Sequence, residues 1–112
     1  MYKNKLKNKT ILIAEDDIFS FQLLTEYFSD TGAHIIHVKT GLEVIEMCKN
    51  IQEIDLILMD IKLPEKNGIE AAEIIRTFRK EILILAQTAG IMSNEIESIF
   101  STGINDFSCS FV

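Results

Sequence analysis

A carboxylate stands where a buried strand is expected to end. In the stretch DLILMDIKLPEKNG, residues 55–68, the apolar run Leu56–Met59 leads directly into Asp60, and a loop with Pro64 and Gly68 follows. A carboxylate at such a position is costly unless it has a partner. Asp60 is therefore predicted either to cap the end of the strand or to lie at the rim of a sheet, where it can bind a cation or react.

Other groups suited to such chemistry follow other apolar runs. Glu15, Asp16 and Asp17 come directly after the first run, and Thr88 follows the fourth. Clustered carboxylates repel one another, so their ionised form needs a cation, and Mg²⁺ takes oxygen ligands of this kind. An aspartate beside Mg²⁺ can attack a phosphoryl group and form an acyl phosphate, while a hydroxyl such as that of Thr88 offsets charge on the phosphoryl oxygens. No glycine-rich phosphate loop is present, so we expect the phosphoryl group to arrive on a donor.

Two kinds of apolar pattern alternate along the chain and predict the elements that position these groups. Short apolar runs predict strands at Ile11–Ala14, Ala33–Val38, Ile54–Met59, Ile82–Ala86 and Asn105–Ser108. Apolar residues at helical spacing lie between the runs: Phe21, Leu24 and Phe28; Val44, Met47, Cys48 and Ile51; Ala71, Ile74, Ile75 and Phe78; Ile96, Ile99 and Phe100.

Strict alternation of strands and helices predicts a parallel sheet with helices on both faces, an α/β doubly wound fold. The carboxyl ends of parallel strands meet at one edge of the sheet, where ligands bind in such folds. Asp60, Glu15, Asp16 and Thr88 are therefore expected at one edge. His34 and His37 lie on the second predicted strand, and we expect both to be structural residues away from this edge.

Composition limits the classes of function. The chain has 112 residues, enough for one domain, and a net charge of −6. Residues 1–10 hold four lysines and no acid, so residues 11–112 carry 7 basic and 17 acidic residues, a balance of −10. That balance argues against direct nucleic-acid binding, and the basic leader is expected to be a solvated linker.

Localisation is predicted from apolar runs and cysteines. No run approaches the roughly 20 apolar residues that span a bilayer, so no membrane association is expected. Cys48 and Cys109 have no motif spacing, which predicts free thiols in a reducing, cytoplasmic compartment.

Four segments resemble a known family. Their order and spacing are those of the receiver domain of bacterial two-component response regulators. The four segments are ILIAEDD, LILMDIKLPEKNG, AQTA and GINDF. The resemblance covers about residues 10 to 112 and leaves residues 1–9 as a leader. It implies a flavodoxin-like five-stranded sheet of order 2-1-3-4-5. It also implies a phosphorylation-controlled switch, not an enzyme, that receives a phosphoryl group from a histidine kinase or a histidine phosphotransfer protein.

The resemblance also implies roles for residues around the acidic group. Asp60 matches the phosphoacceptor, Asp16 the direct Mg²⁺ ligand, and Glu15 the acid that acts through water. Lys62 should give its backbone carbonyl to the metal. For Asp17, a metal role and a role at the start of a helix both stay open.

The remaining matches concern the switch. Thr88 matches the switch hydroxyl and Phe107 the switch aromatic, but Ser110 and Phe111 stand where the family has Lys and then Pro. Serine offers one neutral donor with a shorter reach than lysine. The chain stops at Val112, where the fifth helix of the family should begin. A missing fifth helix would leave an apolar face open beside the Phe21 helix and favour a homodimer.

Three functions are therefore compared. The first is a phosphorylatable receiver, either alone or within a hybrid sensor kinase. The second is a pseudo-receiver, a binding module in which phosphorylation is weak or absent because Ser110 replaces the lysine. The third, an Mg²⁺-dependent phosphatase, is disfavoured because Lys62 stands where a second aspartate is needed.

Overall fold

The fold is a five-stranded parallel sheet with helices on both faces. The computed structural model describes residues 4–51, 53–88 and 104–109. The strands are β1 (Thr10–Ala14), β2 (His34–Val38), β3 (Leu56–Asp60), β4 (Leu83–Thr88) and β5 (Asp106–Cys109), and their order in the sheet is β2-β1-β3-β4-β5. The helices in the described residues are α1 (Ile18–Phe28), α2 (Gly41–Asn50) and α3 (Gly68–Arg76). This confirms the predicted doubly wound fold and strand order; the helix predicted around Ile96–Phe100 lies outside the described residues.

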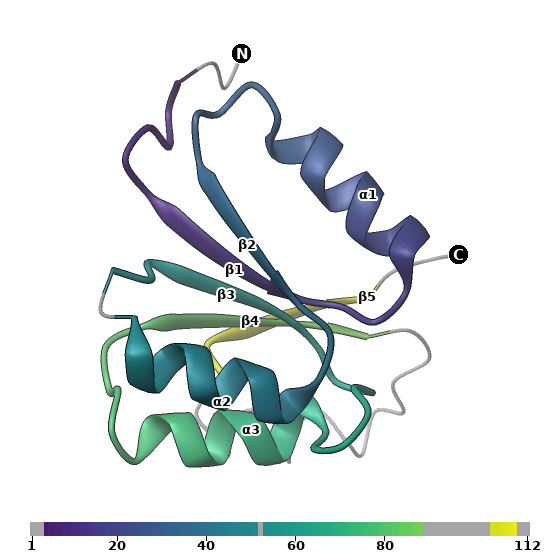
Figure 1. Ribbon diagram of the computed structural model, residues 1–112, viewed down its shortest axis with the longest axis vertical. Coiled ribbons are helices and arrows are strands. Elements are labelled where there is room, and N and C mark those ends of the chain that lie inside the picture. Colours follow the sequence, from purple (N-terminus) through teal and green to yellow (C-terminus); the bar gives the residue numbers. More distant parts are fainter. Residues whose placement is uncertain (1–3, 52, 89–103, 110–112) are drawn as a thin grey trace.

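Two apolar clusters cover the two faces of the sheet. Figure 1 shows α1 on one face and α2 with α3 on the other. The larger cluster packs α2 and α3 against the sheet; among its fully buried side chains are Leu12, Val44, Cys48, Ile57, Met59, Ile75 and Ile84. The smaller cluster holds Ile11, Ile13 and Leu58, against which Phe21, Leu24 and Phe28 of α1 pack. Successive residues of β1 thus face opposite clusters, which is why its sequence is apolar throughout.

Every predicted strand differs from the observed one by one or two residues at an end. The start of β3 and the end of α3 differ for physical reasons. Ile54 is buried, but β3 begins only at Leu56, because the Asp55 carboxylate accepts a hydrogen bond from the Thr10 backbone N–H over 2.8 Å. The expectation that Phe78 continues the apolar face of α3 was wrong. The helix ends at Arg76, and Phe78 is 41% exposed.

The basic leader contacts the domain. The backbone N–H of Asn4 donates to the Asp30 carbonyl over 2.7 Å, and that of Leu6 donates to the Thr31 carbonyl over 2.8 Å. The Leu6 side chain also packs against the cluster beneath α1. Residues 4–9 thus contact the domain through main-chain bonds and Leu6, while all of them except Leu6 are exposed to solvent. The division at residue 9 stays a prediction.

The face that carries α1 is only partly covered by the described residues. Leu56 and Leu85 are half-buried, and Leu83 is 52% exposed. A groove of about 430 Å³ runs past Leu6, Ile11, Leu56 and Leu83. The expected homodimer through this face stays a prediction.

Arg79 ties the end of α2 to the start of β3. Its Nη1 donates to the carbonyls of Ile51 over 2.6 Å and Cys48 over 3.3 Å, and its Nη2 donates to the Ile54 carbonyl over 3.4 Å. These carbonyls include acceptors left over at the helix C-terminus, where a cation is favourable.

Replacing Arg79 should therefore destabilise the fold. Because hydrogen bonds to a charged group contribute more than neutral ones, we expect Arg79→Ala to lower the free energy of unfolding by about 2 kcal/mol, measured by urea denaturation. Lys80→Ala, at the neighbouring exposed position, is the control and should change it little. Equal unfolding midpoints for the two variants would contradict this role.

Candidate functional site

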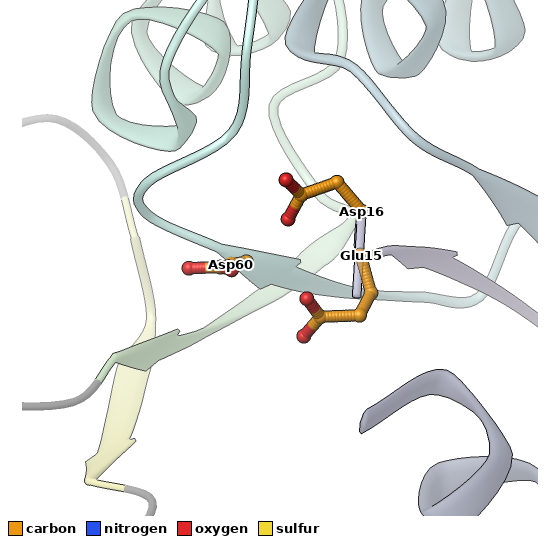
Figure 2. Close-up of side chains that lie close together, drawn as sticks. All are labelled: Glu15, Asp16 and Asp60. Carbon is orange, nitrogen blue, oxygen red and sulfur yellow. The ribbon is translucent and has the colours of Figure 1, made fainter. Parts of the chain in front are cut away.

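Three carboxylates meet where β1 and β3 end. Asp60 is the last residue of β3, and Glu15 and Asp16 directly follow β1, which pairs with β3. One carboxylate oxygen from each residue lies within 4.8 Å of the others. Figure 2 shows the side chains of Glu15 and Asp16 reaching toward Asp60. The structure thus brings together the three acids that the sequence placed at one edge.

The three carboxylates differ in exposure. Glu15 is buried, Asp60 is half-buried and Asp16 is exposed. Such a set of oxygen ligands, graded from buried to exposed, fits Mg²⁺, which binds through one or two carboxylates and keeps several waters. Asp60, being half-buried, is reachable from solvent.

The loop after β3 holds the Asp60 side chain and main chain. The backbone N–H of Lys62 donates to Asp60 Oδ1 over 3.0 Å, and that of Gly68 donates to the Ile61 carbonyl over 2.8 Å. A Cβ on Gly68 would lie 2.6 Å from the Asp60 carbonyl oxygen and 2.9 Å from the Ile61 Cα. Only glycine allows α3 to begin this close to the strand end.

Asp17 caps α1. Its Oδ2 accepts hydrogen bonds from the backbone N–H of Ser20 over 3.1 Å and from the Ser20 hydroxyl over 2.8 Å. These bonds lower the pKa of the Asp17 carboxyl. The backbone N–H of Asp17 also donates to Glu15 Oε2 over 3.1 Å. Of the two roles that stayed open for Asp17, the helix N-cap is the one seen.

Burial changes the protonation of Glu15. Removal from water, with a smaller contribution from the nearby Asp60 carboxylate, raises the pKa of Glu15 from 4.5 to about 7. A bound cation would oppose both effects, because it favours the ionised carboxylate.

The metal-free protein should therefore lose stability as the pH rises. Between pH 4.5 and about 7, the folded protein keeps a proton on Glu15 that the unfolded chain has released. The free energy of unfolding should fall across this window by up to about 3 kcal/mol. Urea denaturation with a chelator, below and above the window, measures the change. Glu15→Gln should remove this pH dependence. Glu26→Gln, on the exposed surface of α1, is the control and should retain it. If the free energy of unfolding of Glu15→Gln still falls with pH as in the wild type, Glu15 is not the group that titrates.

His37 lies beside the site, so the expectation that it lies away from the carboxyl edge was wrong, although its contact there is with the main chain. Its Nε2 is 2.8 Å from the backbone carbonyl oxygen of Glu15. His37 is the next-to-last residue of β2, so it too lies near the carboxyl edge, whereas His34 begins the strand at the other end. The signal in the sequence was the position of His37 at the end of its apolar run.

The other predicted site residues are placed only in part. Thr88 is the last residue of β4, and its neighbour Gln87 pairs with Asp60. Phe107 lies in β5, in register with Ala86 of β4. Ser110 lies outside the described residues. The roles of Thr88, Phe107, Ser110 and the Lys62 carbonyl stay predictions.

The strand order and the acids at the carboxyl edge define the class of protein: a doubly wound α/β domain with an acidic site at the ends of β1 and β3. A family model described as the response regulator receiver domain matches residues 11–108. The chain belongs to this family, whose members are signalling switches of two-component systems.

Relatives show the same domain within longer proteins. The chain is 34% identical over 96 residues to transcription factor SKN7 of Saccharomyces cerevisiae, a match that covers 86% of this chain and 15% of that protein. It is 32% identical over 108 residues to histidine protein kinase 1 of Candida albicans, covering 87% of this chain and 4% of that one. The chain thus spans a small part of these relatives.

Solved structures of receiver domains are similar. One, the receiver domain of a Pseudomonas aeruginosa sensor histidine kinase with magnesium in its active-site cleft, has a TM-score of 0.83 and 25% identity over 94% of this chain and 87% of that one. Another comes from a Saccharomyces cerevisiae complex of a histidine phosphotransfer protein with the receiver domain of its downstream response regulator. Its TM-score is 0.84 at 27% identity, over 96% of this chain and 81% of that one.

No helix in the described residues is long and apolar enough to cross a membrane.

Proposed function

We propose that this chain accepts a phosphoryl group on Asp60 from a phosphohistidine donor, in an Mg²⁺-dependent reaction, and acts as a phosphorylation-controlled switch. The observation that carries the proposal is the group of Glu15, Asp16 and Asp60, with carboxylate oxygens within 4.8 Å at the carboxyl edge of the sheet. Asp60 belongs to this group and also begins a loop held by Lys62 and Gly68.

The chemistry follows from the oxygens of Asp60. Oδ1 accepts the Lys62 N–H, which leaves Oδ2 to attack phosphorus. The new O–P bond forms as the N–P bond of the phosphohistidine breaks, and the imidazole leaves with the bonding electrons and takes up a proton. Asp16, Asp60 and the Lys62 carbonyl would hold the metal directly and Glu15 through water. When bound, Mg²⁺ offsets the negative charge of the carboxylates and of the phosphoryl oxygens.

A histidine kinase or a histidine phosphotransfer protein is the proposed donor. The receiver domain of the similar yeast structure was crystallised with a histidine phosphotransfer protein. In this chain, α1 begins beside the acidic group, and Phe19, Leu23 and Tyr27 on it are 73%, 68% and 70% exposed. An apolar surface that starts beside the acceptor and continues along α1 suits a protein donor better than a small one. The proposed location is the cytoplasm, with no direct contact to nucleic acid.

Incubation with acetyl phosphate and Mg²⁺, followed by intact mass measurement, tests the proposal. The protein should gain the mass of one phosphoryl group, and a chelator should prevent the gain. No gain under any condition, with the fold intact, would instead favour the pseudo-receiver.

A further inference from the structure

The main-chain carbonyl of Glu15 lies beyond the regular pairing of β1 with β2. The Glu15 N–H donates to the Val38 carbonyl over 3.0 Å. In a parallel ladder the next bond would run from the Thr40 N–H to the Glu15 carbonyl. Thr40, however, is the N-cap of α2, and its N–H donates to Glu43 Oε1 over 3.1 Å. The capping box of α2 thus takes the donor that the ladder would have used.

The His37 side chain takes the place of the missing donor. Its Nε2 lies 2.8 Å from the Glu15 carbonyl oxygen. A carbonyl oxygen only accepts hydrogen bonds, so Nε2 must carry the hydrogen. Both polar main-chain groups of Glu15 are therefore bonded to the end of β2.

Phe21 of α1 holds the imidazole in this orientation. The rings of Phe21 and His37 are stacked, with centroids 3.5 Å apart and planes 7° from parallel. Both residues are half-buried. A stacked ring between helix and strand has few other rotamers, so the direction of the Nε2–H bond is well defined.

We propose that His37 is a positioning residue for the acidic site: it fixes the main chain of Glu15 and, through it, the carboxylate that faces Asp60 and Asp16. This inference rests on one part of the proposed function, namely that the three acids bind Mg²⁺. Groups that orient metal ligands from outside change metal affinity by about 10- to 100-fold when they are removed.

Two substitutions separate the hydrogen bond from the packing. His37→Phe keeps a ring to stack on Phe21 but has no donor, whereas His37→Gln keeps a donor near the position of Nε2. Calorimetric titration with Mg²⁺ should show binding about tenfold weaker in His37→Phe and a recovery of most of this loss in His37→Gln. His34→Phe, on the same strand but exposed at its other end, should bind Mg²⁺ like the wild type.

A measurement on the wild-type protein covers the case in which His37→Phe does not fold. Nitrogen-15 NMR of the histidine rings, at a pH where the ring is neutral, should show the hydrogen of His37 on Nε2, slow to exchange with water, and a shift of this signal on addition of Mg²⁺. A hydrogen on Nδ1 instead would overturn the inference, as would equal Mg²⁺ affinity in His37→Phe and the wild type. If the wild type itself binds no Mg²⁺, the proposed metal site fails and the inference fails with it.

Discussion

Asp60→Asn is expected to abolish phosphorylation by acetyl phosphate. Asparagine has nearly the same shape, and its Oδ1 can still accept the Lys62 N–H that Asp60 accepts over 3.0 Å. The second oxygen, which we propose as the nucleophile, becomes an amide nitrogen whose electron pair is delocalised. The loop should stay in place while the reaction is lost. Intact mass after incubation with the phosphodonor and Mg²⁺ should show no adduct.

Asp55→Asn is the matched control. Asp55 directly precedes β3, at the end opposite Asp60. Its carboxylate accepts the Thr10 N–H over 2.8 Å, and the asparagine oxygen can make the same bond. This variant should gain the phosphoryl group like the wild type. An undiminished adduct in Asp60→Asn would show that another residue is the acceptor.

Asp16→Ala is expected to weaken Mg²⁺ binding by about 100-fold. Loss of groups that merely orient metal ligands costs about 10- to 100-fold in affinity, and loss of a ligand should reach the upper end of that range. Asp16 is exposed, so truncation of its side chain should leave the fold intact. Calorimetric titration with Mg²⁺ measures the change, and phosphorylation by acetyl phosphate should slow in parallel.

The neighbouring acid provides a demanding control. Asp17→Ala removes a carboxylate one residue further along the chain, but that carboxylate caps α1 through Ser20. The variant should lose about 1 kcal/mol of stability and keep its Mg²⁺ affinity, because the Asp17 N–H to Glu15 is a main-chain group. If Asp17→Ala weakens Mg²⁺ binding as much as Asp16→Ala, the assignment of the two acids is wrong.

The fold could be predicted because each element carries its own local signal. Apolar runs such as Ile11–Ala14 and Leu56–Met59 alternate with residues at helical spacing, and parallel strands joined by helices allow few topologies. The element boundaries carry a weaker local signal, because an apolar residue such as Ile54 can be buried outside the strand. Phe78 has the spacing of a core residue, but it follows the end of its helix.

The sequence by itself also determined which acids meet. Residues that follow parallel strands lie at one edge, so the proximity of Asp60 to Glu15 and Asp16 follows from their positions in the chain. Only the tertiary structure decided what each acid does there. Asp16 and Asp17 are adjacent and chemically identical, and the turn into α1 places the first beside Glu15 and Asp60 and makes the second a cap. The burial that raises the pKa of Glu15 to about 7, and the hydrogen bond from His37 that holds its carbonyl, depend on groups distant in sequence. Proximity follows from topology, whereas burial and hydrogen bonding depend on how separate elements pack.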